Sequence, residues 1–154
     1  MISKLHEAHP YEEVAYDIYP LENAHQQIGS GMIGELEKEM DEKKFLDYLK
    51  TSMNAGNIRH TSLMRKRVKR VAVCGGAGSF LLNDAIRAGA QFFVTADFKY
   101  HQFFDADGII VIADIGHYES EQFTSELIKE LLVRNFSTFA VRLTELVTNP
   151  VQYY

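Results

Sequence analysis

The sequence predicts an α/β protein with a mostly parallel sheet and helices on both faces. Three short apolar segments, at residues 71–74, 91–95 and 108–113, have the composition of buried strands. Each is followed by glycine-rich or polar residues and then by a helical pattern. Strands that alternate with helices in this way usually pair in parallel, with right-handed crossovers. The 154 residues, 46% of them hydrophobic, suffice for one ordinary core.

The first part of the chain carries weaker signals. Residues 9–20 alternate apolar and other side chains between two prolines, which predicts an edge strand. No partner strand is evident before a glycine-rich turn at residues 29–34, so we expect that an N-terminal segment is missing. Asp41 is placed to cap an amphipathic helix that ends near Asn54 and Gly56.

Two further elements are expected after the strand at 108–113. A long helix should begin near His117, because apolar residues recur at helical spacing up to Leu131. A last strand is predicted over residues 137–143.

Charge and cysteine content restrict the function. The formal net charge of −5 disfavours nucleic-acid binding, although residues 65–70 include five basic side chains. No aromatic residues interleave with these charges, so we interpret them as the solvated start of a strand. Cys74 is the only cysteine, which excludes an internal disulfide and predicts a reducing, cytoplasmic location. No apolar run has the roughly 20 residues of a membrane span, and no secretory signal is visible.

The strongest chemical signal is the pair His117 and Glu121. The two residues are four apart at the start of a predicted helix, so they share one face. They follow the carboxyl end of a strand, where sites form in parallel sheets. The apolar stripe of the helix points in the same direction, which predicts that the pair faces inward. An inward imidazole and carboxylate are suitable ligands for zinc, manganese or iron, although a surface or capping pair remains an alternative.

A second pair, Asp97 and His101, repeats this spacing after the preceding strand. The two pairs could face one cleft, and Asp114 could orient one of the metal ligands by a hydrogen bond without itself contacting the metal. The glycines at 29, 31 and 34 match a dinucleotide-binding pattern but lack the surrounding βαβ unit. The glycine-rich run at residues 75–79 predicts either close packing of a strand and a helix, which we favour, or an anion site.

Several of these motifs together resemble one family. The runs at residues 71–79, 95–101 and 116–121, with Thr148-Asn149-Pro150 near the end, are similar to the Nif-three-like proteins, also described as GTP cyclohydrolase I type 2 homologues. Residues 1–27 resemble the end of a ferredoxin-like domain that is inserted between the two lobes in many bacterial members. Residues 28–154 resemble the C-terminal α/β lobe. Ala96 stands where the family usually has glycine.

The resemblance implies a two-lobed protein that assembles into a ring, usually a hexamer, with two divalent metal ions between the lobes. His117 and Glu121 match the C-terminal metal ligands of the family, whereas the other ligands belong to an N-terminal lobe that this chain lacks. The chain would then be a fragment.

Two functions follow as alternatives. One is a metal-dependent hydrolase acting on a nucleotide or related phosphorylated compound, in which Asp97 or His101 carries a proton or contacts the substrate. The other is a non-catalytic metal-binding protein with a regulatory or interaction role.

Overall fold

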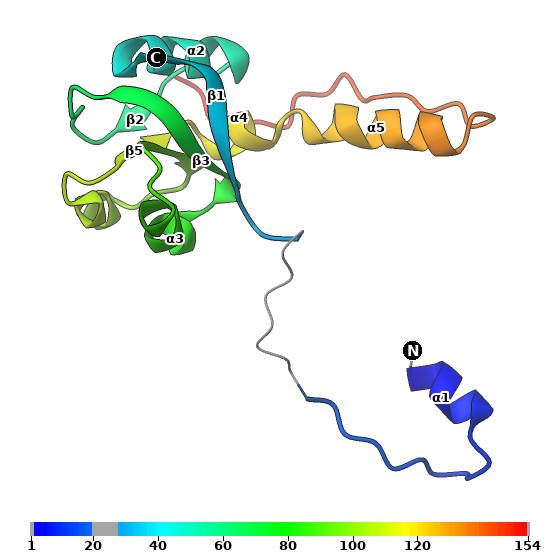
Figure 1. The fold of residues 1–154 in the computed structure, drawn as a ribbon. Helices are drawn as coiled ribbons and strands as arrows, with labels where there is room; N and C mark the ends of the chain where they lie inside the picture. The colour runs from blue at the N-terminus through cyan, green and yellow to red at the C-terminus, as the bar shows by residue number, and fades with distance from the viewer. Residues whose placement is uncertain (1, 20–27, 154) are drawn as a thin grey trace.

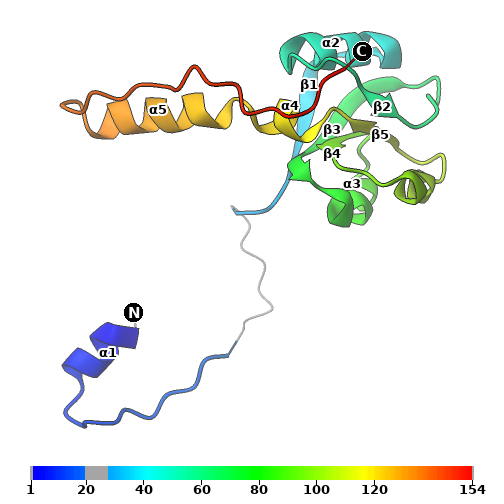
Figure 2. The ribbon, with the colours of Figure 1, turned by 180° about the vertical axis from the view of Figure 1, so that it is seen from behind.

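The computed structural model describes residues 2–19 and 28–153, and its sheet is mixed rather than mostly parallel. The five strands within these residues have the order β1-β3-β4-β5-β2 (Figure 1 and Figure 2). They are β1 (Met32–Asp41), β2 (Arg59–His60), β3 (Arg67–Ala77), β4 (Phe92–Ala96) and β5 (Val111–Asp114). The central pairs β3–β4 and β4–β5 are parallel, whereas β1 and β2 add antiparallel edges. The predicted βα units therefore form the centre of the sheet, and the prediction fails at its edges.

Helices cover both faces of the sheet, as predicted. The described helices are α1 (Ile2–Ala8), α2 (Glu42–Ser52), η1 (Ser79–Leu81), α3 (Leu82–Arg87), η2 (Tyr100–Ala106), α4 (His117–Glu121) and α5 (Thr124–Asn135). Along β4, Phe92 packs in the core beneath α2, while Phe93 packs in the core beneath α3 and η2. Figure 2 shows α2 and α3 on opposite sides of the sheet.

Strand β1 was not predicted, and its composition explains why. It is rich in charged residues and mostly exposed, so it lacks the apolar alternation of a half-buried strand. It is held by the basic start of β3: Arg67 pairs with Asp41 at 2.8 Å, and Arg70 lies 3.8 Å from Glu35. The basic run of residues 65–70 thus begins a strand, as expected, and part of its charge is balanced within the molecule.

The helix expected after Asp41 is present, but its cap differs. Asp41 has extended backbone geometry, yet its side chain makes no capping hydrogen bond. Instead it accepts a hydrogen bond from Arg67. Asn54 has a positive φ of 47° two residues after the helix, consistent with the predicted end.

The edge strand expected over residues 9–20 is not formed in the part of it that the structure describes, residues 9–19. Residues 9–19 contain neither helix nor strand, and α1 precedes them. A strand needs a hydrogen-bonded neighbour, and no described strand pairs with this segment. The last residue of the expected strand, residue 20, lies outside the described residues. So do residues 21–27, the end of the expected first domain.

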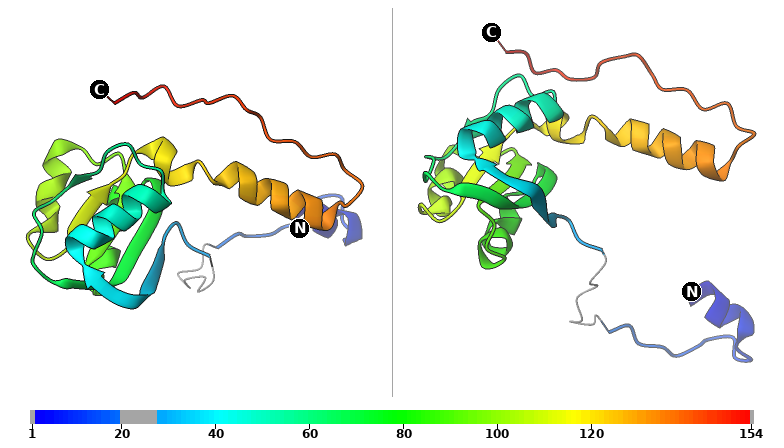
Figure 3. Two further views of the ribbon diagram at one scale, coloured as in Figure 1. Left: turned by 90° about the horizontal axis from the view of Figure 1, so that it is seen from above. Right: turned by 45° about the horizontal axis from the view of Figure 1, so that its top comes forward.

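The C-terminal elements also differ from the prediction. The expected long helix is broken at Gln122 and Phe123, which separate α4 from α5. Residues 137–143 form no strand, because none of the described strands pairs with them. Helix α5 extends away from the sheet, and the C-terminal segment runs back beside it (Figure 3). No helix in the described part of the chain is both long and apolar enough to cross a membrane.

Candidate metal centre

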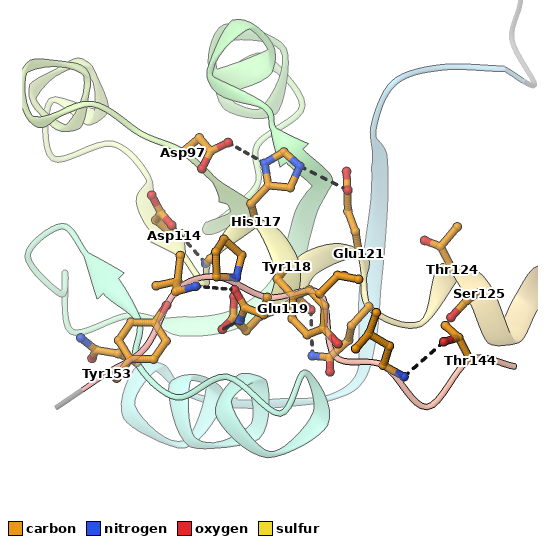
Figure 4. A pocket seen from close by; sticks show the side chains of 18 of the residues that line it. Asp97, Asp114, His117, Tyr118, Glu119, Glu121, Thr124, Ser125, Thr144 and Tyr153 are labelled. Carbon is orange, nitrogen blue, oxygen red and sulfur yellow. Dashed lines mark hydrogen bonds and ion pairs between the residues drawn. The ribbon is translucent and has the colours of Figure 1, made fainter.

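Three loops meet at the carboxyl ends of the parallel strands. Asp97 directly follows β4, two residues separate β5 from α4, and the glycines at the end of β3 lie beneath α4. Asp97 and α4 border a cavity of about 950 Å³ that extends to the start of α5 and to the C-terminal segment. Figure 4 shows Asp97, His117 and Glu121 together at one end of this cavity.

His117 lies between two carboxylates. Its Nδ1 is 2.6 Å from Asp97 Oδ2, and its Nε2 is 3.2 Å from Glu121 Oε2. The hydrogen bond with Asp97 raises the pKa of His117, and the charges of Asp97 and Glu121 act in the same direction against partial burial. The three side chains are 49–53% exposed.

The expectation that His117 and Glu121 face inward is therefore incorrect. That expectation assumed one continuous helix whose apolar stripe extended through Ile128. The break after Glu121 disconnects α4 from α5, and α5 buries none of its residues. The buried side chain of α4 is instead Glu119, which is 6% exposed.

Gly76 allows α4 to approach the end of β3. It has a φ of +63°, and a Cβ at this position would lie 2.6 Å from Glu121 Oε1 and 3.2 Å from His117 Cε1. The Gly76 N–H donates a hydrogen bond of 2.8 Å to Ser120 Oγ. The favoured interpretation of close packing is thus correct, but the helix in contact is α4 rather than the one that follows in sequence.

Asp114 holds in place the two loops that precede η2 and α4, which carry Asp97 and His117. The residue is 4% exposed, and its carboxylate accepts hydrogen bonds from Phe98 N at 2.9 Å and from Gly116 N at 3.2 Å. Arg59 donates to the same carboxylate, and also to Phe98 O at 3.0 Å. Asp114 therefore orders the backbone next to Asp97 and His117, whereas the orienting carboxylate on the imidazole is Asp97. Arg59 carries no motif signal that would identify it from sequence.

The structure separates Asp97 from His101. Asp97 has a φ of +58° and precedes η2, so the two residues do not share a helical face. His101 is exposed and packs edge-on against Tyr100, with ring centroids 5.2 Å apart. Among the described residues that line the cavity, Asp97 is present and His101 is not.

The donor atoms fit part of a metal centre. Within the described residues, no group of three or more His, Cys, Asp and Glu side chains is arranged to hold an ion. His117 Nε2 and Glu121 Oε2 are nevertheless 3.2 Å apart. Two ligands with bonds of about 2.0–2.2 Å to one ion lie roughly 3 Å apart. Asp97 on the other ring nitrogen matches the carboxylate–histidine arrangement of many metal sites.

No role was predicted from sequence for three further residues near the site. Glu119 lies opposite the pair on α4, where Asn149 Nδ2 approaches its Oε1 at 3.5 Å. Tyr153 lines the same cavity, and burial, followed by the charges of Glu119 and Asp114, raises its pKa. The Thr148-Asn149-Pro150 motif pointed to the C-terminal segment as part of the family resemblance, but it did not indicate what Asn149 does.

The fold and the loops at its sheet edge define an α/β domain with a mixed five-stranded sheet. Comparison with protein-family models assigns it further: the chain belongs to the Duf34/NIF3 (NGG1p interacting factor 3) family, whose model matches residues 3–150. This confirms the resemblance seen in the sequence.

Relatives of known sequence and structure support this assignment. A GTP cyclohydrolase 1 type 2 homolog of Bacillus subtilis is 34% identical over 99% of this chain, which covers 42% of that protein. A crystal structure of a Bacillus cereus protein related to NIF3 matches 99% of this chain at 34% identity, with a TM-score of 0.72 and 43% of that chain covered. A Staphylococcus aureus protein matches with a TM-score of 0.77, 28% identity, and coverage of 99% of this chain and 51% of the other. The chain spans less than half the length of the Bacillus subtilis relative.

Proposed function

We propose that this chain supplies two ligands of a divalent-metal centre, His117 through Nε2 and Glu121 through its carboxylate. The observation that carries the proposal is the arrangement around His117, with Asp97 at Nδ1 and Glu121 beside Nε2. Asp97 would hold the proton on Nδ1 and leave Nε2 free to coordinate an ion. Zinc, manganese and iron all accept this pair of ligands.

We propose further that the longer protein is a hydrolase of a nucleotide or related phosphorylated compound. The name of the relatives, GTP cyclohydrolase 1 type 2 homolog, supports this substrate class. The cavity of about 950 Å³ beside the pair is of a size that accommodates such a ligand. Two bound divalent ions would lower the pKa of a coordinated water and so provide a nucleophile at neutral pH.

Asp97 and His101 remain the candidates for proton transfer or substrate contact. Asp97 is the better placed of the two, because it borders the cavity and bonds to His117. A role for His101 requires that substrate extends beyond the described cavity towards η2.

The larger organisation forms part of the same proposal. Residues 28–154 would be the C-terminal lobe of a two-lobed protein, and residues 1–27 the end of an inserted ferredoxin-like domain. The remaining metal ligands would come from the other lobe, and the whole would form a ring-shaped homo-oligomer, a hexamer, in the cytoplasm. The buried single thiol of Cys74 fits a reducing compartment.

The surface of α5 favours a second candidate function. Leu127, Ile128 and Leu131 on this helix are 45–56% exposed, and an apolar surface of this kind is typical of interaction sites. A non-catalytic regulatory or interaction protein with structural metals would use such a surface. A metal with an exchangeable water would favour the hydrolase, whereas a saturated coordination sphere would favour the interaction protein.

Metal content of purified protein tests the proposal. We would measure zinc, manganese and iron bound to this chain and to a longer protein that includes the N-terminal lobe, each with His117→Ala or Glu121→Ala. The longer protein should hold about two ions and lose metal in both variants. His101→Ala, a change to an exposed histidine outside the cavity, is the control and should keep the metal. Metal that is absent, or that persists in both site variants, would contradict the proposal.

A further inference from the structure

The C-terminal segment contacts the side of α4 opposite the proposed metal ligands. In Figure 4, Glu119 and Tyr153 lie on one side of the α4 backbone, and His117 and Glu121 lie on the other. Because α4 has only five residues, its own hydrogen bonds hold it weakly, and its orientation depends on neighbouring groups.

Glu119 receives the first contact. The residue is 6% exposed, and Asn149 Nδ2 donates a hydrogen bond of 3.5 Å to its Oε1. The side-chain oxygen of Asn149 accepts a hydrogen bond of 3.0 Å from Val151 N, which turns the chain at this point. Removing a carboxylate from water is costly unless it is hydrogen-bonded, so the position of Glu119 is coupled to that of Asn149.

Tyr153 provides the second contact, at the residue before α4. Its ring lies against Gly56, where a Cβ would come within 2.8 Å of Tyr153 Cδ2. Its hydroxyl oxygen is 3.2 Å from the position of a Cβ on Gly116, the residue that precedes α4. Gly116 has a φ of +95°, and the missing side chain leaves room for both the Glu119 carboxylate and the Tyr153 hydroxyl.

We propose that Asn149 and Tyr153 are positioning residues that latch α4 through Glu119 and Gly116, and so set the orientation of His117 and Glu121. This inference rests on the proposed metal-binding function for its consequence, but the latch can be measured without metal. The C-terminal segment would thereby couple one wall of the cavity to the proposed ligands.

An exchange of hydrogen-bonding roles provides the sharpest test. Asn149→Asp places two carboxylates side by side, keeps the acceptor for Val151 N and breaks the contact with Glu119. The double variant Glu119→Gln/Asn149→Asp restores the hydrogen bond, with the amide now on α4. Tyr153→Ala removes the second contact, and Gln152→Ala is a control at an exposed neighbour in the same segment.

Two measurements are made on the full chain. Amide hydrogen exchange of residues 117–122 reports how firmly α4 is held, and zinc titration reports the ligand pair. We expect Asn149→Asp and Tyr153→Ala to accelerate exchange in α4 but not in α3, and to weaken zinc binding about tenfold, as loss of a supporting contact does in other metal sites. The double variant should return both values close to those of the parent chain, and Gln152→Ala should leave both unchanged.

The outcomes separate the two proposals. Unchanged exchange in Asn149→Asp, a failure of the double variant to restore it, or faster exchange with unaltered zinc affinity would each overturn the positioning role. If the parent chain and the longer protein bind none of zinc, manganese and iron, the metal-binding function fails. The exchange data then decide by themselves whether the latch holds α4, and unchanged exchange would overturn it as well.

Discussion

Gly76→Ala is the substitution whose effect can be worked out most fully. A methyl group here meets two separate penalties. The φ of +63° is strained for any residue with a Cβ, and the new atom would lie 2.6 Å from Glu121 Oε1. The strain acts on stability, whereas the steric contact acts on the proposed ligand pair.

The two penalties have different sizes. The left-handed backbone conformation costs about 1–2 kcal/mol for a non-glycine residue. In a chain of this length that corresponds to a fall in Tm of roughly 2–8 °C. The contact with Glu121 adds little to this loss, because a half-exposed carboxylate can rotate away. That rotation, however, breaks the 3.2 Å approach of Glu121 Oε2 to His117 Nε2.

Gly108→Ala is a matched control. Gly108 has the same φ of +63°, and a Cβ there meets nothing within 4 Å. Urea unfolding should give similar losses of stability for the two variants, while zinc titration should show at least tenfold weaker binding only for Gly76→Ala. Equal zinc affinity in Gly76→Ala and Gly108→Ala would refute the placement of Gly76 beneath a ligand pair.

Three further outcomes are expected. Glu42→Ala should lower the free energy of unfolding in urea by about 1–3 kcal/mol, because the buried carboxylate accepts hydrogen bonds of 2.9 Å from Met64 N and Arg65 N; an unchanged midpoint would contradict this. Iodoacetamide at pH 8 should alkylate Cys74 at least about tenfold more slowly in the folded chain than in urea, because burial and, secondarily, the charge of Glu121 raise the pKa of its thiol; equal rates would contradict this. Asp97→Asn should weaken zinc binding about tenfold without unfolding the chain, as judged by titration and circular dichroism, and undiminished affinity would contradict the orienting role.

The central strands were predictable because burial on both faces leaves a strong local pattern. Every residue of β4 and β5 is buried, and all of them except Thr95 and Asp114 are apolar. Strand β1 lacks that pattern, since its charged residues face solvent and it is specified by pairing with the distant Arg67 and Arg70. The converse error occurred at residues 9–19 and 137–143, where local alternation is present but no strand among the described residues pairs with the segment.

The candidate site was predictable to a similar degree. The spacing of His117 and Glu121 identified the pair, because four residues separate neighbours on one helical face at any degree of burial. Their exposure was mispredicted, since the break between α4 and α5 leaves no clear signal in the sequence. Asp97 was identified correctly, but His101 does not line the cavity beside it. The positive φ of Asp97 places this residue outside η2, so Asp97 and His101 do not share a helical face.

The arrangement around α4 also bears on whether the pair is only a surface feature. A half-exposed ion pair contributes little to stability, so folding alone gives no reason to support one closely. Yet the short helix is fixed from three directions: by Gly76 at the end of β3, by Asp114 through the Gly116 N–H, and by Asn149 through Glu119. These contacts restrict the side chains that face the cavity, which is what a binding partner with strict geometric demands requires, and a metal ion is such a partner.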